Sequence, residues 1–219
     1  MPIYNGCFFE TTDYPYEKAA TYQLNSYVTL ALVDIHKIEN ESTSDLKLYD
    51  NKIQYYRHYL DNVFYCLGQI HSRFATTEKG NHDIVAAKKN LIKLNRTNYD
   101  FSEDNFPILS NKMPRNIIEH VDERNLLTIK ESNGVGGFNV IFEDSDQELI
   151  SDLLDNRQFY PYILDLRNKS VYFYNIQSNA DNNKEFQINL LKLKEELLKL
   201  KKNIKKIDNY LEWPFRTRP

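Results

Sequence analysis

The feature that most constrains the fold is a run of apolar residues near the end of the chain, which recurs at steps of four and three without interruption. Its members are Phe186, Leu190, Leu193, Leu197, Leu200, Ile204, Ile207 and Leu211. This spacing is a heptad seam, the pattern of a helix that buries one stripe against a neighbouring helix. The seam predicts a long C-terminal helix at about 184–211, packed either within a bundle or between subunits.

Three more helices are predicted in the first half of the chain, where apolar residues recur at the helical period. They cover the regions from Tyr16 to Ile38 and from Ile53 to Phe74, and the region after Asn81, a plausible N-cap. The stretch from Asn95 to Lys112 is rich in Asn, Asp and Ser. It is too irregular for an element and too long for a plain connector, and such loops often carry function.

Beyond residue 125 the pattern changes from helical to strand-like. The runs LLTIKES, FNVIFED, FYPYILDL and SVYFYNIQ are rich in β-branched and aromatic residues, and the turn segments NGVGG and RNKS separate them in pairs. We expect about four antiparallel strands in an insertion at about 126–177, with DQELISDLLD as a helix between the hairpins. The predicted fold is mainly α: a single domain over residues 1–219, a bundle of four to five helices with this small antiparallel β insertion.

Composition limits the classes of function. The 219 residues are 41% hydrophobic and 27% charged, as in folded globular proteins. A formal net charge of -3 and a pI of about 6.0 lack a strong basic excess, so any nucleic acid must be bound locally. Cys7 and Cys66 form no metal or disulfide motif, which favours a cytoplasmic location. Neither a signal peptide nor a run of about 18 apolar residues is found, so no membrane association is expected.

Two sequence features are better explained by structure than by binding. The glycines of NGVGG lack the following helix and the Lys-Ser/Thr pair of a phosphate loop, and they fit a hairpin turn. Lys192, Lys199 and Lys206 share one face of the predicted C-terminal helix and could contact phosphates. A charged outer face is also the normal companion of a heptad seam.

Histidines and aromatic residues give two further candidate sites. No histidine pair has the four-residue spacing of helical zinc sites, so no metal is expected; the four considered are His36, His58, His71 and His82. Aromatic residues in YDFSEDNF, at positions 99–106, could stack on unpaired bases if they are exposed. More often such residues pack into a buried face.

The segment MPRNIIEHVDE, at positions 113–123, carries the strongest chemical signal. His120 can accept and return a proton near neutral pH, because the unperturbed pKa of histidine is about 6.5. Asn116 lies one helical turn before His120 and could orient the imidazole or a ribose hydroxyl. Arg115 is always charged and matches phosphate oxygens in geometry, so it could stabilise a phosphorane-like transition state. These three residues are the candidate catalytic group of a phosphodiester-cleaving site.

Helical geometry separates two members of this group. Five residues at about 100° each place Arg115 and His120 roughly 140° apart around one helix. One straight helix therefore cannot easily direct both side chains at one phosphorus atom. Two copies facing each other across a twofold axis could, because such an interface brings the same patch from both subunits together. The motif therefore predicts a homodimer with a composite cleft.

The run from Arg115 through Asn116 to His120, late in a helical bundle, resembles the Arg-x4-6-His signature of the HEPN superfamily. The resemblance covers the predicted helices before residue 125 and the last helix. It implies a metal-independent, cofactor-free endoribonuclease of a toxin-antitoxin or abortive-infection system, which acts on RNA as a homodimer. In such an enzyme His120 would activate the 2′-hydroxyl, leaving a 2′,3′-cyclic phosphate. A partner antitoxin protein is also implied.

This sequence departs from the family pattern at one position. In toxins of the Arg-x4-His-x-Tyr type, an antitoxin nucleotidylates the tyrosine two residues after the histidine, and here that residue is Asp122. Control by that modification is therefore not expected. Glu119, Asp122 and Glu123 would also favour the protonated imidazole and repel RNA, an effect that Arg124 would partly offset.

Two other hypotheses remain open from the sequence. One is a non-catalytic dimeric interaction module in a defence or regulatory complex, held together by the seam from Leu190 to Leu211. The other is a helical bundle that binds a nucleotide without turning it over. The RNA target, the antitoxin and the role of the β insertion are not encoded in any motif of this chain.

Overall fold

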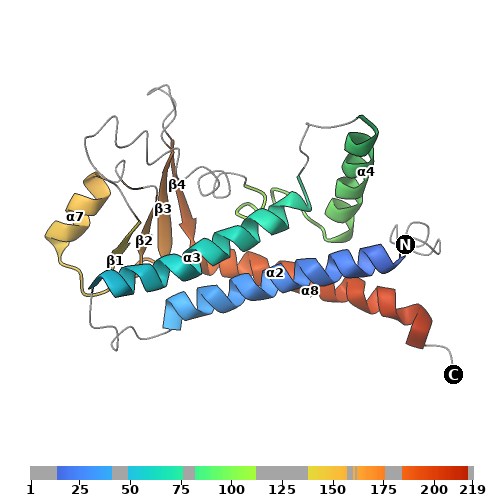
Figure 1. Cartoon of the computed structure of the whole chain (residues 1–219), viewed down its shortest axis with the longest axis horizontal. Helices are drawn as coiled ribbons and strands as arrows, with labels where there is room; N and C mark the ends of the chain where they lie inside the picture. The colour runs from blue at the N-terminus through green and yellow to red at the C-terminus, as the bar shows by residue number, and fades with distance from the viewer. Residues whose placement is uncertain are drawn as a thin grey trace. The chain divides into compact units, whose positions relative to one another are not determined.

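The computed structural model describes residues 14–40, 49–75, 82–111, 138–156, 160, 162–175 and 184–216. The chain divides into two compact units. Unit 1 comprises Met1–Leu32, Cys66–Asn111 and Glu195–Pro219, and unit 2 comprises Val33–Tyr65 and Lys112–Lys194. The chain is mainly helical with a small four-stranded sheet (Figure 1), as the sequence predicted at this level.

The described helices are α2 (Tyr14–Asn40), α3 (Tyr49–Ser72), α4 (His82–Asn98), α7 (Gln147–Asp155) and α8 (Leu190–Arg216). The three long helices, α2, α3 and α8, each supply residues to both units. None of the helices described in the structure combines the length and the apolar character that crossing a membrane requires.

The predicted heptad seam of α8 packs within the chain. Its described members are at most 2% exposed, and they are Leu190, Leu193, Leu197, Leu200, Ile204 and Ile207. The side chain of Leu211 lies outside the described residues. Because the seam is already covered in a single chain, it is not available as the subunit contact that the interaction-module hypothesis assigned to it.

In unit 1, α4 extends beyond the predicted apolar pattern and ends in a C-capping motif. Asp100 has a φ of 52°, the left-handed conformation that Gly, Asn or Asp adopts most readily after a helix. The N–H of Phe101 donates to the carbonyl of Arg96 at 2.8 Å, and that of Asp100 donates to Thr97 at 3.3 Å. This Schellman arrangement turns the chain back toward the unit and directs Phe101 into its core.

Unit 2 contains the sheet, with strand order β1-β2-β3-β4. The strands are β1 (Asn139–Ile141), β2 (Tyr162–Asp165), β3 (Ser170–Asn175) and β4 (Lys184–Asn189). The pairs β2–β3 and β3–β4 are antiparallel, whereas β1 and β2 are parallel. The prediction of an all-antiparallel insertion was therefore wrong. The helix α7, which was predicted, is long enough to carry the chain back so that β2 runs beside β1 in the same direction.

A second correction concerns the start of the C-terminal helix. The sequence predicted helix from about residue 184, but residues 184–189 form β4 and α8 begins at Leu190. Phe186 fits the heptad spacing, yet it also alternates with polar residues up to the buried Ile188, the period of a strand. Asn189 then accepts the N–H of Lys192 at 3.0 Å and caps the helix, which fixes where the helix begins.

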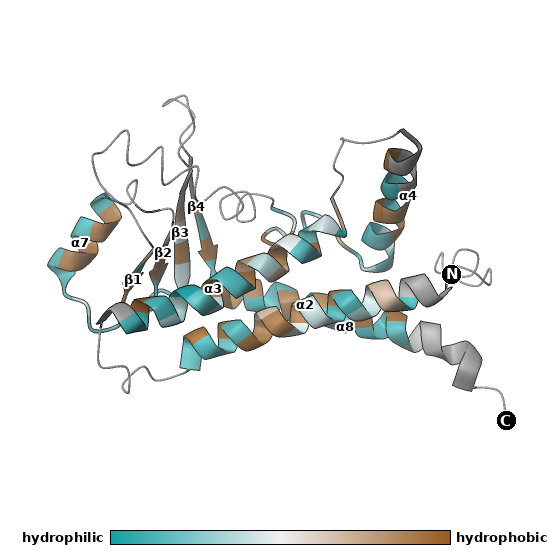
Figure 2. Ribbon diagram, in the orientation of Figure 1, coloured by the Kyte–Doolittle hydropathy of each residue, from teal (hydrophilic) through white to brown (hydrophobic). Residues whose placement is uncertain are grey.

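The sheet is covered by helices on both faces. Ile141 and Ile163 pack with Ile150 and Leu153 of α7, along which hydrophobic and hydrophilic stretches alternate (Figure 2). On the other face, the ring of Phe64 of α3 lies 5.1 Å from Phe173. All four residues of β2 are consequently buried, as expected for a strand with both faces covered.

Candidate functional site

The predicted catalytic residues Arg115, Asn116 and His120 lie in the segment 112–137, outside the described residues. The same holds for Asp122, for the glycines of NGVGG and for the strand predicted at LLTIKES. The structure therefore leaves the arrangement of these residues as a prediction.

A buried carboxylate holds the loop that leads to this segment. In unit 1, Glu196 of α8 accepts the N–H of Ile108 at 3.0 Å and that of Leu109 at 2.9 Å. Burial raises the pKa of Glu196 above its ordinary value of 4.5, although these hydrogen bonds and the charge of Lys199 act in the opposite direction. The loop 99–111, expected to be irregular, is thus fixed by the last helix.

The aromatic residues of this loop form core instead of a base-stacking surface. The ring of Phe101 stacks on Phe74 at a centroid distance of 3.8 Å and on Phe106 at 4.9 Å. Phe101 and Phe106 are 4% and 0% exposed, and Tyr99 is 5% exposed. The stacking of unpaired bases on these side chains, one alternative from the sequence, is therefore not available.

One lysine of the predicted basic stripe has a structural role. The ammonium of Lys199 lies 5.0 Å from the ring centroid of Phe106 and donates to Asn105 Oδ1 at 3.0 Å. Lys192 and Lys206 are exposed. Lys199 thus contributes to holding the loop against α8. One of the three lysines of the predicted stripe therefore has a structural contact.

Within the part of the chain that the structure describes, no group of three or more His, Cys, Asp or Glu side chains is placed to hold a metal ion. His36 bonds Asn40 at 2.9 Å, and His58 lies 3.4 Å from Asn62. Both contacts join residues four apart on one helix, which is local surface packing.

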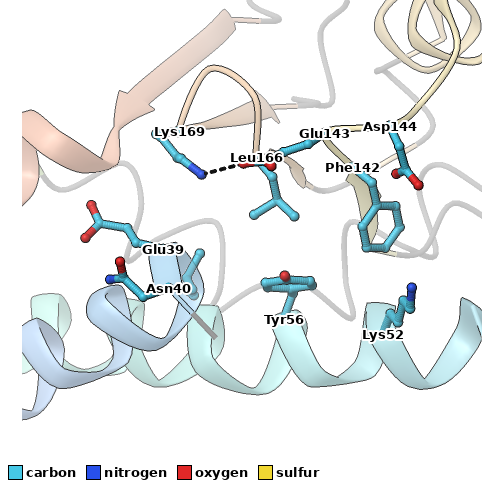
Figure 3. Close-up of a pocket in the computed structure, with 10 residues that line it drawn as sticks. Glu39, Asn40, Lys52, Tyr56, Phe142, Glu143, Asp144, Leu166 and Lys169 are labelled. Carbon is cyan, nitrogen blue, oxygen red and sulfur yellow. Dashed lines mark hydrogen bonds and ion pairs between the residues drawn. The ribbon is translucent and has the colours of Figure 1, made fainter. Parts of the chain in front are cut away.

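Unit 2 contains a pocket of about 430 Å³ that sequence reasoning did not anticipate (Figure 3). Its walls come from the last turn of α2 (38–40), from Lys52 and Tyr56 of α3, from residues 142–144 after β1, and from Leu166 and Lys169 after β2. Because β1 and β2 are parallel, their carboxyl ends meet at this edge of the sheet. Ligands of open α/β sheets commonly bind beyond the carboxyl ends of strands.

The two walls contributed by the sheet are fixed by local hydrogen bonds. Buried Asp165 accepts the backbone N–H groups of Arg167 at 3.0 Å and Asn168 at 3.2 Å, and it also accepts from both of their side chains. This network supports the left-handed backbone of Lys169, with φ of 48°. After β1, the N–H of Phe142 donates to Ser145 Oγ at 2.9 Å. The pocket edge is therefore preformed.

The α3 wall is tied to the sheet by a buried tyrosine. Tyr162 of β2 donates a short hydrogen bond to Asp61, which also pairs with Arg57 at 3.5 Å. Burial, followed by the charge of Asp61 and the hydrogen bond to it, raises the pKa of Tyr162 far above its ordinary range. The hydroxyl therefore stays protonated and remains a donor at all physiological pH values.

Charged side chains at the pocket are partly paired. Lys169 pairs with Glu143 at 3.1 Å, and Glu39 pairs with Lys194. Lys52 and Asp144 are the other two charged residues that line it. Figure 3 shows the side chains of Tyr56, Leu166 and Phe142 between these charged groups, and Tyr56 and Leu166 are each only 5% exposed.

The two units differ in charge. Unit 1 has 14 Lys and Arg residues against 12 Asp and Glu residues, a formal charge of +2. Unit 2 has 14 against 19, a formal charge of -5, and together these give the -3 of the whole chain. The pocket thus lies in the unit with the negative formal charge.

The pocket residues could have been found only through the parallel pairing. In the sequence, the first strand is followed by FED and then by the pattern of α7. The second strand comes next and runs into DLRNKS. This is a β-α-β order with polar residues after each strand. If the strands are read as hairpins, these polar residues fall in unrelated turns.

Comparison of the chain with protein-family models, with curated proteins and with solved structures found no match.

Proposed function

We propose that this protein is a metal-independent endoribonuclease of the HEPN type, active as a homodimer. The observation that carries the proposal is the pattern of Arg115, Asn116 and His120, which joins a general base to a phosphate-binding cation at the spacing of that superfamily. The mainly helical chain is in keeping with it. The substrate is RNA, because the chemistry requires a 2′-hydroxyl.

The reaction is an internal transesterification. His120 takes the proton of the 2′-hydroxyl, and the 2′-oxygen forms a bond to the adjacent phosphorus. Arg115 stabilises the added negative charge on the phosphoryl oxygens, and Asn116 orients the attacking ribose. The bond to the 5′-oxygen then breaks, and that oxygen receives a proton from an imidazolium. The products are a 2′,3′-cyclic phosphate and a 5′-hydroxyl.

The cellular role that fits this activity is a toxin of a toxin-antitoxin or abortive-infection system. Unrestrained cleavage of RNA halts growth, so such an enzyme needs a partner protein that restrains it. Because Asp122 replaces the tyrosine that some antitoxins modify, we propose restraint by binding of an antitoxin instead of by nucleotidylation.

One exposed helix face in unit 1 suits the proposed homodimer. From Ala19 to Leu32 the helix α2 contains no charged residue, although Tyr22 is 73% exposed and Leu30 is 52% exposed. Ser26 lies midway between them, and its hydroxyl donates to the carbonyl of Tyr22 at 3.0 Å. A twofold antiparallel crossing at Ser26 would place Tyr22 of each subunit against Leu30 of the other.

The assay that tests the nuclease compares purified wild-type protein with three variants on a long transcript, with and without EDTA. His120→Ala and Arg115→Ala should lower the cleavage rate by about a hundredfold or more. Arg124→Ala, which removes a charge from the same segment, should leave most activity. Light scattering should find His120→Ala still dimeric. Cleavage that survives in His120→Ala contradicts the proposal, and a wild-type dimer without cleavage supports the non-catalytic module.

The dimer surface is tested separately by charge insertion. Leu30→Lys should convert the dimer to a monomer in light scattering, because a buried lysine without a partner opposes association. Leu198→Lys is the matched control, since Leu198 of α8 is 51% exposed and lies among lysines. A dimer that persists in Leu30→Lys, or one lost equally in both variants, rules out this face.

A further inference from the structure

We propose that the second half of α8 binds the RNA substrate by its phosphate backbone. The surface involved, here called the lysine face, consists of Lys201, Lys202, Lys205 and Lys206, two adjacent pairs separated by one helical turn. All four belong to unit 1, whose formal charge is +2. Exposed lysines attract the phosphates of a nucleic acid and release its condensed counterions. The choice of RNA among polyanions rests on the proposed nuclease function.

The four lysines form one patch instead of being spread around the helix. At about 100° per residue, they fall within roughly 140° of the helix circumference. Lys202, Lys205 and Lys206 are exposed, and Lys201 is half-buried. Residues four apart on a helix are neighbours, so Lys201 lies beside Lys205 and Lys202 lies beside Lys206. The patch therefore presents a local excess of positive charge.

The stability of α8 does not account for this pattern. A solvated helix face usually has acidic and basic residues four apart, whereas no acidic residue occurs from Leu197 to Ile207. Like charges four residues apart slightly destabilise a helix, so the lysine pairs oppose the folding of α8. The helix dipole does not offset this, because it acts within the last turn and α8 continues to Arg216. The lysines are therefore better explained by an anionic ligand.

The lysine face has no carboxylate bonded to it among the described contacts. Earlier in α8, by contrast, Lys194 forms an ion pair with Glu39 of α2. The next acidic residue after the lysine face is Asp208, which is exposed and forms no described ion pair. From Ala19 to Leu32 the helix α2 has no charged residue, so that part of α2 cannot neutralise the lysines. The four charges are thus available to an external anion.

The loop 99–111 contains acidic residues and lies beside α8. The amide of Asn203 donates to a carbonyl of this loop at 2.8 Å, which places the loop on the Asn203 side of the helix. Around the helix, Lys206, Lys202 and Lys205 lie about 60°, 100° and 160° from Asn203. The acidic residues of the loop are Asp100, Glu103 and Asp104, and all three are exposed. They repel phosphates from the loop side, so the RNA is expected on the side of Lys202 and Lys205.

A phosphate-bearing membrane fits this surface less well than a nucleic acid does. A helix that binds a bilayer inserts a continuous apolar stripe between the lipids. The apolar stripe of α8 is the heptad seam, whose described members are at most 2% exposed. The leucines Leu191 and Leu198 are about half exposed, and two separate leucines bury too little area to replace that stripe. Nucleic acid phosphates need only the exposed cations.

The test is fluorescence anisotropy of a labelled single strand of RNA whose 2′-hydroxyl groups are methylated, titrated with the full-length protein. This strand cannot be cleaved by a 2′-hydroxyl, so binding is measured whether or not the protein is a nuclease. The triple variant Lys202→Gln/Lys205→Gln/Lys206→Gln should weaken binding by about tenfold or more at about 0.1 M salt. The slope of log affinity against log salt should become shallower by about 2, since each lost phosphate contact removes about 0.7.

A matched variant separates the lysine face from the net charge of unit 1. The variant Lys88→Gln/Lys89→Gln/Lys93→Gln removes three exposed lysines from α4 in the same unit, and it should weaken binding by less than about twofold. Glutamine is a good helix former, so both variants should keep the circular dichroism of the wild type. If the α8 variant loses helix, Lys202→Gln alone decides, with a slope that is shallower by about 0.7.

The possible results separate this proposal from the nuclease. Equal losses in the two triple variants, or an unchanged salt slope in the α8 variant, would overturn the lysine face. So would a wild-type protein that does not bind the RNA, including one that binds vesicles rich in phosphatidylserine instead. Binding of the methylated strand through these lysines by a protein that leaves native RNA intact would support the lysine face and defeat only the nuclease.

Discussion

Among the described residues, each unit has a buried carboxylate that accepts backbone N–H groups, and the two differ in how far along the chain their partners lie. Asp165 of unit 2 accepts backbone N–H groups two and three residues ahead. Glu196 of unit 1 accepts N–H groups 88 and 87 residues away. Asp165 shapes its own turn, whereas Glu196 joins the last helix to a loop from the middle of the chain.

The difference shows which parts of a loop the local sequence can specify. An aspartate before a turn closes its hydrogen bonds as soon as the turn forms, and it does so largely independently of the rest of the fold. The hydrogen bonds of Glu196 need α8 beside the loop, where Lys199 of the same helix also lies 5.0 Å from the ring centroid of Phe106. The loop 99–111 therefore depends on long-range packing.

The largest effect is expected from Glu196→Ala. The substitution leaves two N–H groups in a poorly solvated site without an acceptor, so it should lower the free energy of unfolding by about 3 kcal/mol. Glu195→Ala is the matched control, an exposed neighbour that should change stability by less than about 0.5 kcal/mol. Urea unfolding gives both values. Hydrogen exchange should accelerate in residues 105–111 only in Glu196→Ala.

Asp165→Ala should have a smaller and more local effect. Its N–H partners lie in a turn that water reaches more easily, so a loss of about 2 kcal/mol is expected in the same urea measurement. Asp165→Asn keeps one acceptor for the backbone, so its free energy of unfolding should fall by about half as much. Faster hydrogen exchange should be confined to residues 165–170. Exchange that spreads through unit 2 would contradict the local role.

The smallest expected effect is a pH dependence of the free energy of unfolding, caused by Glu196. Because the pKa of Glu196 is raised in the folded state, that state binds its proton more tightly than the unfolded chain does. The contribution to stability is therefore present below the ordinary value of 4.5 and is lost as pH rises through the raised pKa. The difference in unfolding free energy between wild type and Glu196→Gln should fall over that window. A difference that grows with pH would refute the raised pKa.

The helices and the strands β1, β2 and β3 could be predicted from the sequence, because their signals are local, whereas β4 was predicted as the start of the last helix. The heptad spacing predicted α8, and DQELISDLLD predicted α7, where Asp146 accepts the N–H of Leu149 at 2.7 Å as an N-cap. The parallel pairing of β1 with β2 could not be predicted, since the same strands also fit a hairpin reading. Phe186 satisfied both the strand and the helix period, and only the cap at Asn189 separates them.

The two candidate sites also differ in whether the local sequence could identify them. Arg115, Asn116 and His120 are close in the chain, so a motif identified them, and their arrangement lies outside the described residues. Tyr56, Phe142 and Lys169 are brought together by the fold, and no pattern in the sequence relates them. Tyr56 lies in the helix that was predicted from Ile53 to Phe74.

The described part of the loop held by Glu196 ends at Asn111, four residues before Arg115, and the proposed nuclease residues belong to the segment that follows. The most direct measurement is the chemistry of the ends formed when the protein acts on a transcript in EDTA. We predict that wild-type protein produces 2′,3′-cyclic phosphate and 5′-hydroxyl ends and that His120→Ala produces none. A transcript whose 2′-hydroxyl groups are methylated should not be cleaved. Ends bearing a 5′-phosphate, or equal cleavage of the methylated RNA, would contradict the account.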